Sequence, residues 1–173
     1  MSTERSVELR PATRDDVPAI RSVHERSIRG LGRAVYDEEQ VEAWAAGCGA
    51  ADYASAIEAS SVRFLVAEDD DGIVGFASGT TDPDEAGVDG EVTGLYVVPE
   101  VARDGVGSLL LSALEDWLAS RGVSRVGLTA SRNAVGFYEC HGYEAVEERE
   151  HEFSFQLETG VTGTVIHMTR ELG

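Results

Sequence analysis

Lysine is absent from this sequence, and all 14 basic residues are arginine. The absence excludes a Walker A phosphate loop, because that loop needs a lysine that reaches the phosphates. It also leaves few positive charges for nucleic acid, since binding to a phosphate backbone depends on clustered basic side chains. We therefore expect no nucleic-acid partner.

The sequence is also poor in cysteine and in long apolar runs. Its two cysteines, Cys48 and Cys140, do not make a disulfide framework in a chain of 173 residues, and we interpret them as small buried residues. No apolar run approaches the length of a membrane span, and the N-terminal segment has no apolar signal core. These absences predict a cytoplasmic protein with no membrane partner, folded as a single domain over residues 1–173.

Acidic residues are what the sequence has in excess. It contains 32 Asp and Glu residues against 14 basic ones, which gives a net charge of −18. At about 1 M salt the Debye length falls to about 3 Å, so the repulsion between carboxylates is screened while they still hydrate the surface. A GC-rich genome would explain arginine in place of lysine, but it would not explain the acid excess. We favour an origin in a salt-accumulating halophile.

Hydropathy patterns predict a mixed α+β domain with one strand–helix–strand unit in the middle. The predicted strands cover 6–13, 62–80 (a hairpin with an Asp-Gly turn at 69–72), 91–98, 124–130, 143–157 and 162–172. The predicted helices follow Thr13, cover 37–47 and 50–60 with Gly47 and Gly49 between them, follow Gly105, and cover 134–142. An exposed edge strand in the C-terminal part would allow a homodimer.

Two glycines stand at the start of the most regular predicted helix. Gly105 and Gly107 lie where the turn becomes helix, although glycine costs about 1 kcal/mol relative to alanine in a helix. A helix N-terminus has unpaired amides and a partial positive charge, and glycines let a phosphate approach them. A dinucleotide fingerprint does not fit, because its third glycine falls on Leu110. The alternatives are a phosphate-binding loop of another kind or a tight turn.

Three motifs together resemble the GNAT superfamily of N-acetyltransferases. The loop "ARDGVG" is similar to the family's Q/R-x-x-G-x-G/A, and "ASRNAVGFYECHGY" is similar to its N-x-x-A-x-x-x-Y-E-x-x-G-F. The hairpin "FLVAEDDDGIVGFASG" resembles the family's VAE-x-G-x-IVGF. The resemblance covers most of residues 60–145. It implies a GNAT fold, with a twisted, mostly antiparallel sheet of about six to seven strands flanked by helices, and acetyl-CoA as the cofactor.

The resemblance also implies which residues hold the cofactor. The loop assigned to the pyrophosphate of coenzyme A consists of Arg103, Asp104, Gly105, Val106, Gly107 and Ser108. Leu95, Tyr96 and Val97 are implied to lie along the cofactor, with the Val97 amide polarising the thioester carbonyl.

Two positions depart from the family motifs. The family's Gln/Arg falls on Ala102, with Arg103 one place later. The family's asparagine falls on Ser131, with Asn133 two residues further on, so either Ser131 or Asn133 is the candidate contact.

Acetyl transfer to an amine needs a base for the amine and benefits from an acid for the leaving thiolate. The resemblance assigns the acid to Tyr138, since a phenol with a pKa near 10 is protonated at neutral pH; the structural alternative is a core aromatic beside Phe137. Glu91 is the candidate base, acting through water, and its alternative is an ordinary surface carboxylate.

The histidines and the aromatic residues of the helical segment do not indicate a further site. The four histidines, His24, His141, His151 and His167, show no ligand spacing, so we expect no metal and interpret them as structural or surface residues. Tyr36 and Trp44 fall in the segment that walls the acceptor pocket in relatives, and we interpret Trp44 as a packing residue.

These observations favour an enzyme that moves acetyl from acetyl-CoA to an amine by direct attack. The acceptor would be a small molecule or a peptide or protein amine. The alternative is a non-catalytic acyl-CoA sensor on the same scaffold. Turnover of acetyl-CoA with any acceptor separates the two.

The acid excess makes a testable prediction about salt. Transfer from molar KCl to dilute buffer removes the screening of carboxylate repulsion, so the melting temperature should fall by several degrees or more. Thermal unfolding followed by circular dichroism across a KCl series measures this change. A melting temperature that stays constant as KCl is removed would contradict the halophilic interpretation.

Overall fold

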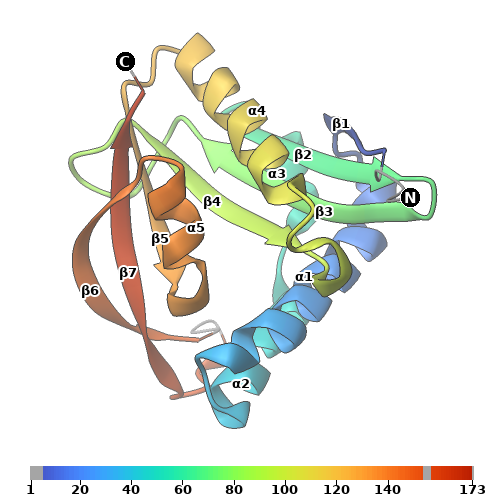
Figure 1. Ribbon diagram of the computed structural model, residues 1–173, viewed down its shortest axis with the longest axis vertical. Helices are drawn as coiled ribbons and strands as arrows, with labels where there is room; N and C mark the ends of the chain where they lie inside the picture. The colour runs from blue at the N-terminus through green and yellow to red at the C-terminus, as the bar shows by residue number, and fades with distance from the viewer. Residues whose placement is uncertain (1–5, 154–156, 173) are drawn as a thin grey trace.

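The computed structural model describes residues 6–153 and 157–172, and Figure 1 shows its elements. The strands are β1 (Glu8–Pro11), β2 (Val62–Asp69), β3 (Gly72–Thr80), β4 (Gly90–Val97), β5 (Arg125–Ser131), β6 (Glu144–Glu152) and β7 (Thr162–Glu171). The helices are α1 (Val17–Leu31), α2 (Glu38–Ala50), α3 (Tyr53–Glu58), α4 (Val106–Ser120) and α5 (Val135–Cys140).

The strands form one seven-stranded sheet in the order β1-β2-β3-β4-β5-β7-β6. Neighbouring strands are antiparallel except β4 and β5, which are parallel because α4 connects them as a crossover helix. The predicted α+β class, the mostly antiparallel sheet and the central strand–helix–strand unit are therefore confirmed. The hairpin of β2 and β3 turns at Asp69 and Gly72, as its sequence predicts.

Helices cover both faces of the sheet (Figure 1). On one face α4 buries Leu110, Leu114 and Leu118 completely. Glycines in β3 and β4 let α4 approach closely, since a Cβ at Gly79 would lie 3.0 Å from Leu114. α1 lies on the opposite face, where the ring of His24 contacts the rings of Phe76 on β3 and Tyr96 on β4. The sheet therefore separates an α4 face from an α1 face.

The helix α2 does not break at its glycines. The sequence predicts an interruption at Gly47 and Gly49, but α2 continues through both to Ala50. Its N-terminus is held by a capping box, in which the Asp37 carboxylate accepts from the Gln40 amide at 2.8 Å. Val41, Ala45 and Cys48 are buried in a second apolar cluster. This packing outweighs a glycine cost of about 1 kcal/mol per residue.

Two smaller expectations are also corrected. Thr13 precedes a short 3₁₀ turn over Arg14–Asp16 before α1 begins, and the Asp16 carboxylate accepts from the Thr13 amide at 2.8 Å. Cys48 is buried as expected, but Cys140 is exposed because it lies at the outer end of α5.

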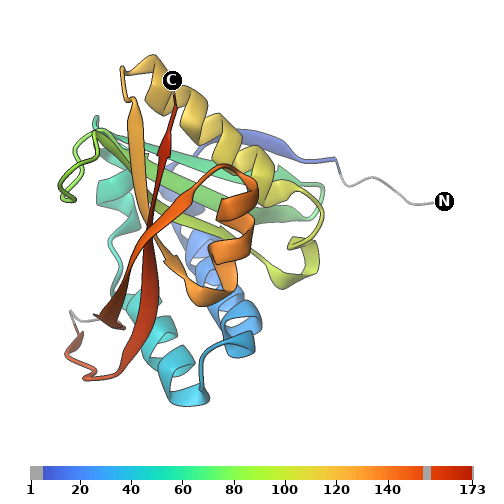
Figure 2. The same ribbon diagram turned by 60° about the vertical axis from the view of Figure 1, so that its left-hand side comes forward.

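The C-terminal part forms β6 and β7. The end of β6 and the start of β7 lie beside α2 (Figures 1 and 2). Part of the predicted strand 143–157, residues 154–156, lies outside the described residues. β6 is an edge strand, as expected, and most of its side chains are exposed. Within the described residues, no helix is long and apolar enough to cross a membrane.

Candidate active site

The central feature of the sheet is a wedge between two parallel strands. β4 and β5 pair only at Gly90–Val126, Glu91–Gly127 and Val92–Leu128, and then separate (Figure 1). The separation begins at a bulge in β4, where Ser78 of β3 faces Gly94 and Gly79 faces Val92. The extra residue is Thr93, and a bulge of this kind bends the strand that carries it. We call the space between residues 93–97 and 129–131 the β4–β5 wedge.

Backbone groups on both sides of the wedge lack a strand partner. The Val98 amide donates to the Val74 carbonyl of β3 at 2.9 Å, so by alternation the amides of Leu95 and Val97 point away from β3. On the other side, the Leu172 amide donates to the Ser124 carbonyl at 2.8 Å. The same alternation turns the backbone of residues 129 and 131 toward the wedge. Backbone groups in this position are suited to pair with an extended ligand.

A cavity of about 260 Å³ occupies the wedge. Its lining comes from both faces of the sheet and consists of Trp44, Val92, Thr93, Gly94, Leu95, Tyr96, Leu128, Thr129, Ala130, Ser131, Ala134, Tyr138, His151, Phe153 and Val165. The cavity thus brings together four of the residues named from the sequence, Leu95, Tyr96, Ser131 and Tyr138. Asn133 is exposed and outside this lining, so of the two alternatives only Ser131 borders the cavity.

Tyr138 reaches the wedge from α5 and is 93% buried, with 7% of its surface exposed. Among the described residues nothing hydrogen-bonds its hydroxyl. Burial raises the pKa of Tyr138 above that of a free phenol, so the hydroxyl stays protonated at neutral pH. The ring of Tyr138 also packs edge-on against Phe137, so the residue is a core aromatic as well, which was the structural alternative.

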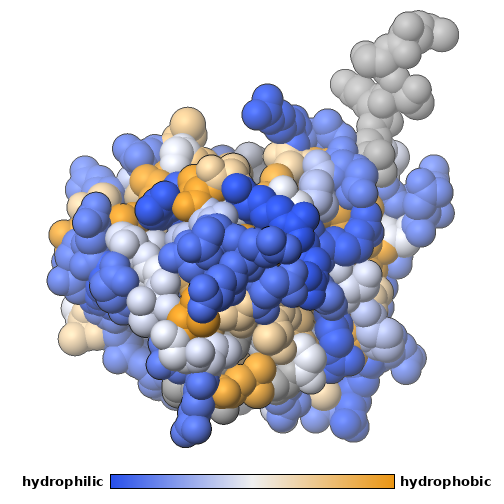
Figure 3. Space-filling view, turned by 90° about the horizontal axis from the view of Figure 1, so that it is seen from below, coloured by the Kyte–Doolittle hydropathy of each residue, from blue (hydrophilic) through white to orange (hydrophobic). Residues whose placement is uncertain are grey.

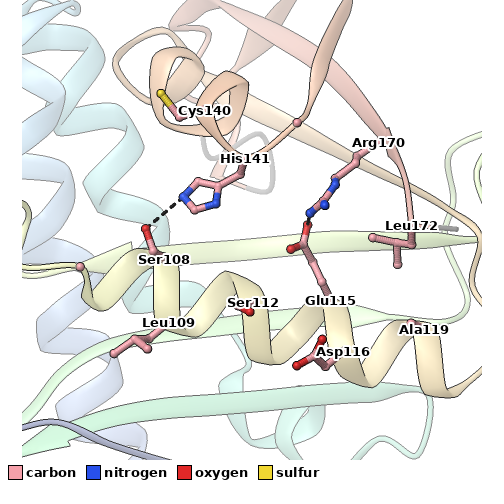
Figure 4. Close-up of a pocket in the computed structure, with 12 residues that line it drawn as sticks. Ser108, Leu109, Ser112, Glu115, Asp116, Ala119, Cys140, His141, Arg170 and Leu172 are labelled. Atoms are coloured by element: carbon pink, nitrogen blue, oxygen red, sulfur yellow. Dashed lines mark hydrogen bonds and ion pairs between the residues drawn. The ribbon is translucent and has the colours of Figure 1, made fainter.

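A buried polar network lies behind Tyr138. The Tyr143 ring packs edge-on against Tyr138 with centroids 5.6 Å apart. The Tyr143 hydroxyl donates to the Glu115 carboxylate of α4 at 2.8 Å, and the Arg170 guanidinium of β7 donates to the same oxygen at 2.7 Å (Figure 4). This network joins α4, the turn after α5 and β7, and the ring of Tyr143 packs against the ring of Tyr138.

The loop before α4 has the geometry of an anion site. Gly105 is the N-cap of α4 with φ +82°, a left-handed conformation that glycine adopts most readily. Gly107 lies beside the Phe137 ring, and a Cβ there would be 3.4 Å from it. Arg103 is exposed and, within residues 6–153 and 157–172, has no ion pair, in contrast to most other arginines. The loop therefore combines a tight turn at Gly105 with the N-terminus of α4.

A second hollow of about 730 Å³ extends from this loop along α4 (Figure 4). It runs from Gly105 between α4, the C-terminal end of α5 and the end of β7. At the end nearest the loop, the Ser108 hydroxyl and His141 Nε2 are 3.0 Å apart. The groove is lined by both polar and apolar residues, and it continues the surface of the glycine loop.

Glu91 lies at the closed end of the wedge. It pairs with Thr80 and Gly127 and does not line the cavity. Burial raises the pKa of Glu91, and the neighbouring Asp84 and Glu85 raise it further. The structure therefore does not bring Glu91 into direct contact with Tyr138, although its environment favours proton uptake.

Sequence reasoning missed several lining residues. Trp44 packs, as interpreted, but it also walls the cavity. His151 borders the cavity as well, whereas His24 and His167 are held inside the fold by hydrogen bonds to Tyr53 and Leu128. The signal for His151 and Phe153 was weak, because their strand reads as a run of charges with no motif.

The seven-stranded sheet, opened between two parallel strands and flanked by helices, is the GNAT fold. The sequence matches the family described as acetyltransferase (GNAT) domain over residues 33–156, and the chain belongs to that family. GNAT acetyltransferases use acetyl-CoA.

Solved structures agree on the fold. A GCN5-related N-acetyltransferase from Rhodopseudomonas palustris is 29% identical, with a TM-score of 0.81 and 99% of each chain covered. The PaiA N-acetyltransferase from Thermoplasma acidophilum, solved with coenzyme A, is 22% identical, with a TM-score of 0.76, 96% of this chain and 99% of that chain covered. The ribosomal-protein-S18-alanine N-acetyltransferase from Escherichia coli is 18% identical, with a TM-score of 0.65. The match covers 97% of this chain and 95% of that chain. Comparison with curated proteins finds no match.

The glycine loop generates a prediction about acetyl-CoA binding. At a hundredfold excess over Kd, acetyl-CoA should raise the melting temperature by roughly 5–10 °C in high salt. Gly107→Asp places a negative charge at the helix N-terminus and should abolish this shift, as measured by differential scanning fluorimetry. Gly107→Ala is the matched control, since its methyl group meets only Phe137 at 3.4 Å. A folded Gly107→Asp protein with the full shift would mean that the phosphates bind elsewhere.

Proposed function

We propose that this protein transfers an acetyl group from acetyl-CoA to an amine by direct attack, without a covalent enzyme intermediate. The observation that carries the proposal is the position of Tyr138, a buried phenol with no hydrogen-bond partner among the described residues, in the lining of the wedge cavity. A non-catalytic binding module would have no need for a buried phenol in the lining of the ligand space.

The residues present fit acetyl-CoA. When bound, it supplies an activated acetyl thioester. The amides of Leu95 and Val97 face the wedge and would pair with an extended chain there. The first amides of α4 and the guanidinium of Arg103 would hold the phosphates. Ser131 would contribute a hydroxyl on the β5 side of the same cavity.

Two side chains of the protein would then transfer protons, and one backbone amide would stabilise negative charge. Tyr138 is protonated at neutral pH and would donate a proton to the leaving thiolate. The Val97 amide would stabilise negative charge on the carbonyl oxygen. Glu91, outside the cavity, would accept the proton of the amine through water.

Glu91 makes a prediction about pH. Its raised pKa moves the acidic limb of kcat/KM upward, because the carboxylate must be ionised to accept a proton. Glu91→Gln should lower kcat/KM about 10- to 100-fold near neutral pH, with a smaller loss at high pH, where the amine is already neutral. The measurement is a pH–rate profile of thiol release, with Glu85→Gln as a control for general loss of nearby charge. A Glu91→Gln profile that matches the wild type would make Glu91 an ordinary carboxylate.

Tyr138 gives the most direct test of the mechanism. Tyr138→Phe removes one hydroxyl and keeps the ring, so the loss should fall on kcat while acetyl-CoA affinity changes little. General acid roles are worth about 10²–10⁴-fold, and a thiol leaving group with a pKa of about 8.5 places this loss near the lower end. Steady-state thiol release in molar KCl measures kcat, and Phe137→Leu serves as the packing control. Wild-type kcat in a folded Tyr138→Phe protein would remove Tyr138 from the reaction.

Two observations favour a second candidate, an acyl-CoA sensor. The motif position usually held by Gln or Arg is Ala102, and Glu91 lies outside the cavity. A sensor would bind acetyl-CoA with the thermal shift described above and release no thiol with any amine. The same acceptor assays therefore distinguish the two functions.

We further propose that the protein works in a salt-rich cytoplasm. The surface seen from below is mostly hydrophilic, with hydrophobic residues in separate patches (Figure 3).

β6, the exposed edge strand, is the surface through which a homodimer would form, and its many glutamates would require salt for a second copy to approach. Sedimentation in molar and dilute KCl tests this, and a monomer in both conditions would exclude the dimer.

A further inference from the structure

The wedge cavity opens toward both faces of the sheet. The residues on the side opposite α4 indicate which class of acceptor the cavity would bind. We propose, on the basis of the proposed acetyl transfer, that the acceptor is a primary amine on a short apolar arm that carries an aromatic ring and no carboxylate. The proposal names a substrate class for the cavity.

The first step is the direction from which each substrate enters. Tyr138 of α5 and Ala134, the residue just before α5, reach the cavity on the same face of the sheet as α4 and the glycine loop. Trp44, from α2, reaches it from the opposite face, on which α1 and α2 pack together. A donor held by the glycine loop occupies the α4 face, so the acceptor must enter beside α2 and the ends of β6 and β7 (Figure 2). We call this opening the acceptor mouth, bounded by Trp44, His151 and Phe153.

The acceptor mouth is walled by aromatic rings. Trp44 and Phe153 are stacked, with centroids 5.7 Å apart and an interplanar angle of 19°. Tyr96 also lines the cavity, and its ring packs edge-on against Trp44 with centroids 6.5 Å apart. Flat apolar walls favour a ring or a flat apolar group in the ligand, because aromatic pairs add attraction beyond the area that they bury.

The rings are held in place by the surrounding structure. Tyr36 packs edge-on against both Trp44 and Phe153, at 5.9 Å and 5.3 Å. Its hydroxyl donates to the Thr164 carbonyl at 2.7 Å and accepts from the Arg132 amide at 3.0 Å. Gly163 leaves room for Phe153, since a Cβ there would lie 2.5 Å from the ring. A wall that is fixed before binding selects ligands by shape.

The charges of the lining exclude other amine classes. Among the described residues, the lining of the cavity includes no aspartate, glutamate, arginine or lysine. The nearby guanidiniums are committed, since Arg132 donates to the Val35 carbonyl at 2.7 Å and Arg149 pairs with Glu85 at 2.7 Å. An amino-acid carboxylate therefore meets no guanidinium or ammonium group among these lining residues, where His151 is the side chain able to carry a positive charge, and a second ammonium group meets no carboxylate.

The first experiment compares amines that differ by one feature. Acetylation of 2-phenylethylamine, phenylalanine, n-butylamine and spermidine is measured by thiol release in molar KCl. Phenylalanine adds only a carboxylate to 2-phenylethylamine, and n-butylamine has an ethyl group in place of the phenyl ring. We expect kcat/KM for 2-phenylethylamine to exceed each of the others by at least tenfold. Equal or better turnover of phenylalanine, n-butylamine or spermidine would overturn the proposed class.

Variants of the wall test where the selectivity arises. Trp44→Ala should lower kcat/KM for 2-phenylethylamine at least tenfold and for n-butylamine less than about threefold. Trp44→Phe keeps a flat ring and should retain most of the preference. Phe153→Leu provides a second variant if Trp44→Ala does not fold, and the acetyl-CoA thermal shift reports folding in each case. A uniform loss for both amines would overturn the assignment of selectivity to these rings.

A binding measurement separates this inference from the proposed reaction. The chain has two tryptophans, and Trp117 on α4 does not line the cavity. In a Trp117→Phe background, 2-phenylethylamine should change Trp44 fluorescence in a saturable way, whereas spermidine should not. Saturable binding without turnover would contradict the acetyl transfer and keep the acceptor class. Turnover confined to another class of amine would keep the transfer and contradict the acceptor class.

Discussion

The separation of β4 from β5 is the constraint on which the rest of the site depends. Three residue pairs join the strands, and the bulge at Thr93 then turns β4 away. A sheet normally pairs its backbone groups, so an interior gap leaves polar groups exposed to whatever enters. In this fold the gap also joins the two faces of the sheet through one cavity. Donor and acceptor can therefore approach the same point from opposite sides without sharing a path.

The protonation of Tyr138 follows from its place beside this gap. The phenol is surrounded by protein, so its charged form is disfavoured and its pKa is raised. The buried network of Tyr143, Glu115 and Arg170 packs behind the ring. The carboxylate of Glu115 is paired by both partners, which lets an acidic residue lie inside the fold without an uncompensated charge. The same network closes α5 against α4.

Negative charge is abundant on the surface and absent from the cavity. Most described arginines form ion pairs or hydrogen bonds at the surface, including the bidentate contact of Arg149 with Glu85. Exposed pairs of this kind contribute little to stability individually. Among the described residues, the lining of the cavity is mostly aromatic and apolar instead, apart from His151 and a few hydroxyl groups. The acid excess of the chain is therefore a property of its surface and not of this lining.

Much of the fold could be predicted from local sequence. Alternating apolar residues predict most of the strands, the Asp-Gly turn predicts the hairpin, and Gly105 marks the start of α4, because period and turn chemistry are local properties. α2 shows the limit of such reasoning. Gly47 and Gly49 indicate a break locally, but Val41, Ala45 and Cys48 pack against a cluster that includes Phe153, which lies far away in the sequence.

The site divides in the same way. The sequence by itself determined the glycine loop, the strand 95–97 and Tyr138, since each belongs to a short motif whose spacing is local. Only the tertiary structure decided that Ser131 and not Asn133 borders the cavity, that Glu91 lies outside it, and that Trp44 and Phe153 form one wall. These facts depend on where β4 leaves β5 and where α2 meets the end of β6. Such contacts join residues distant in the chain, and no local pattern of side chains specifies them.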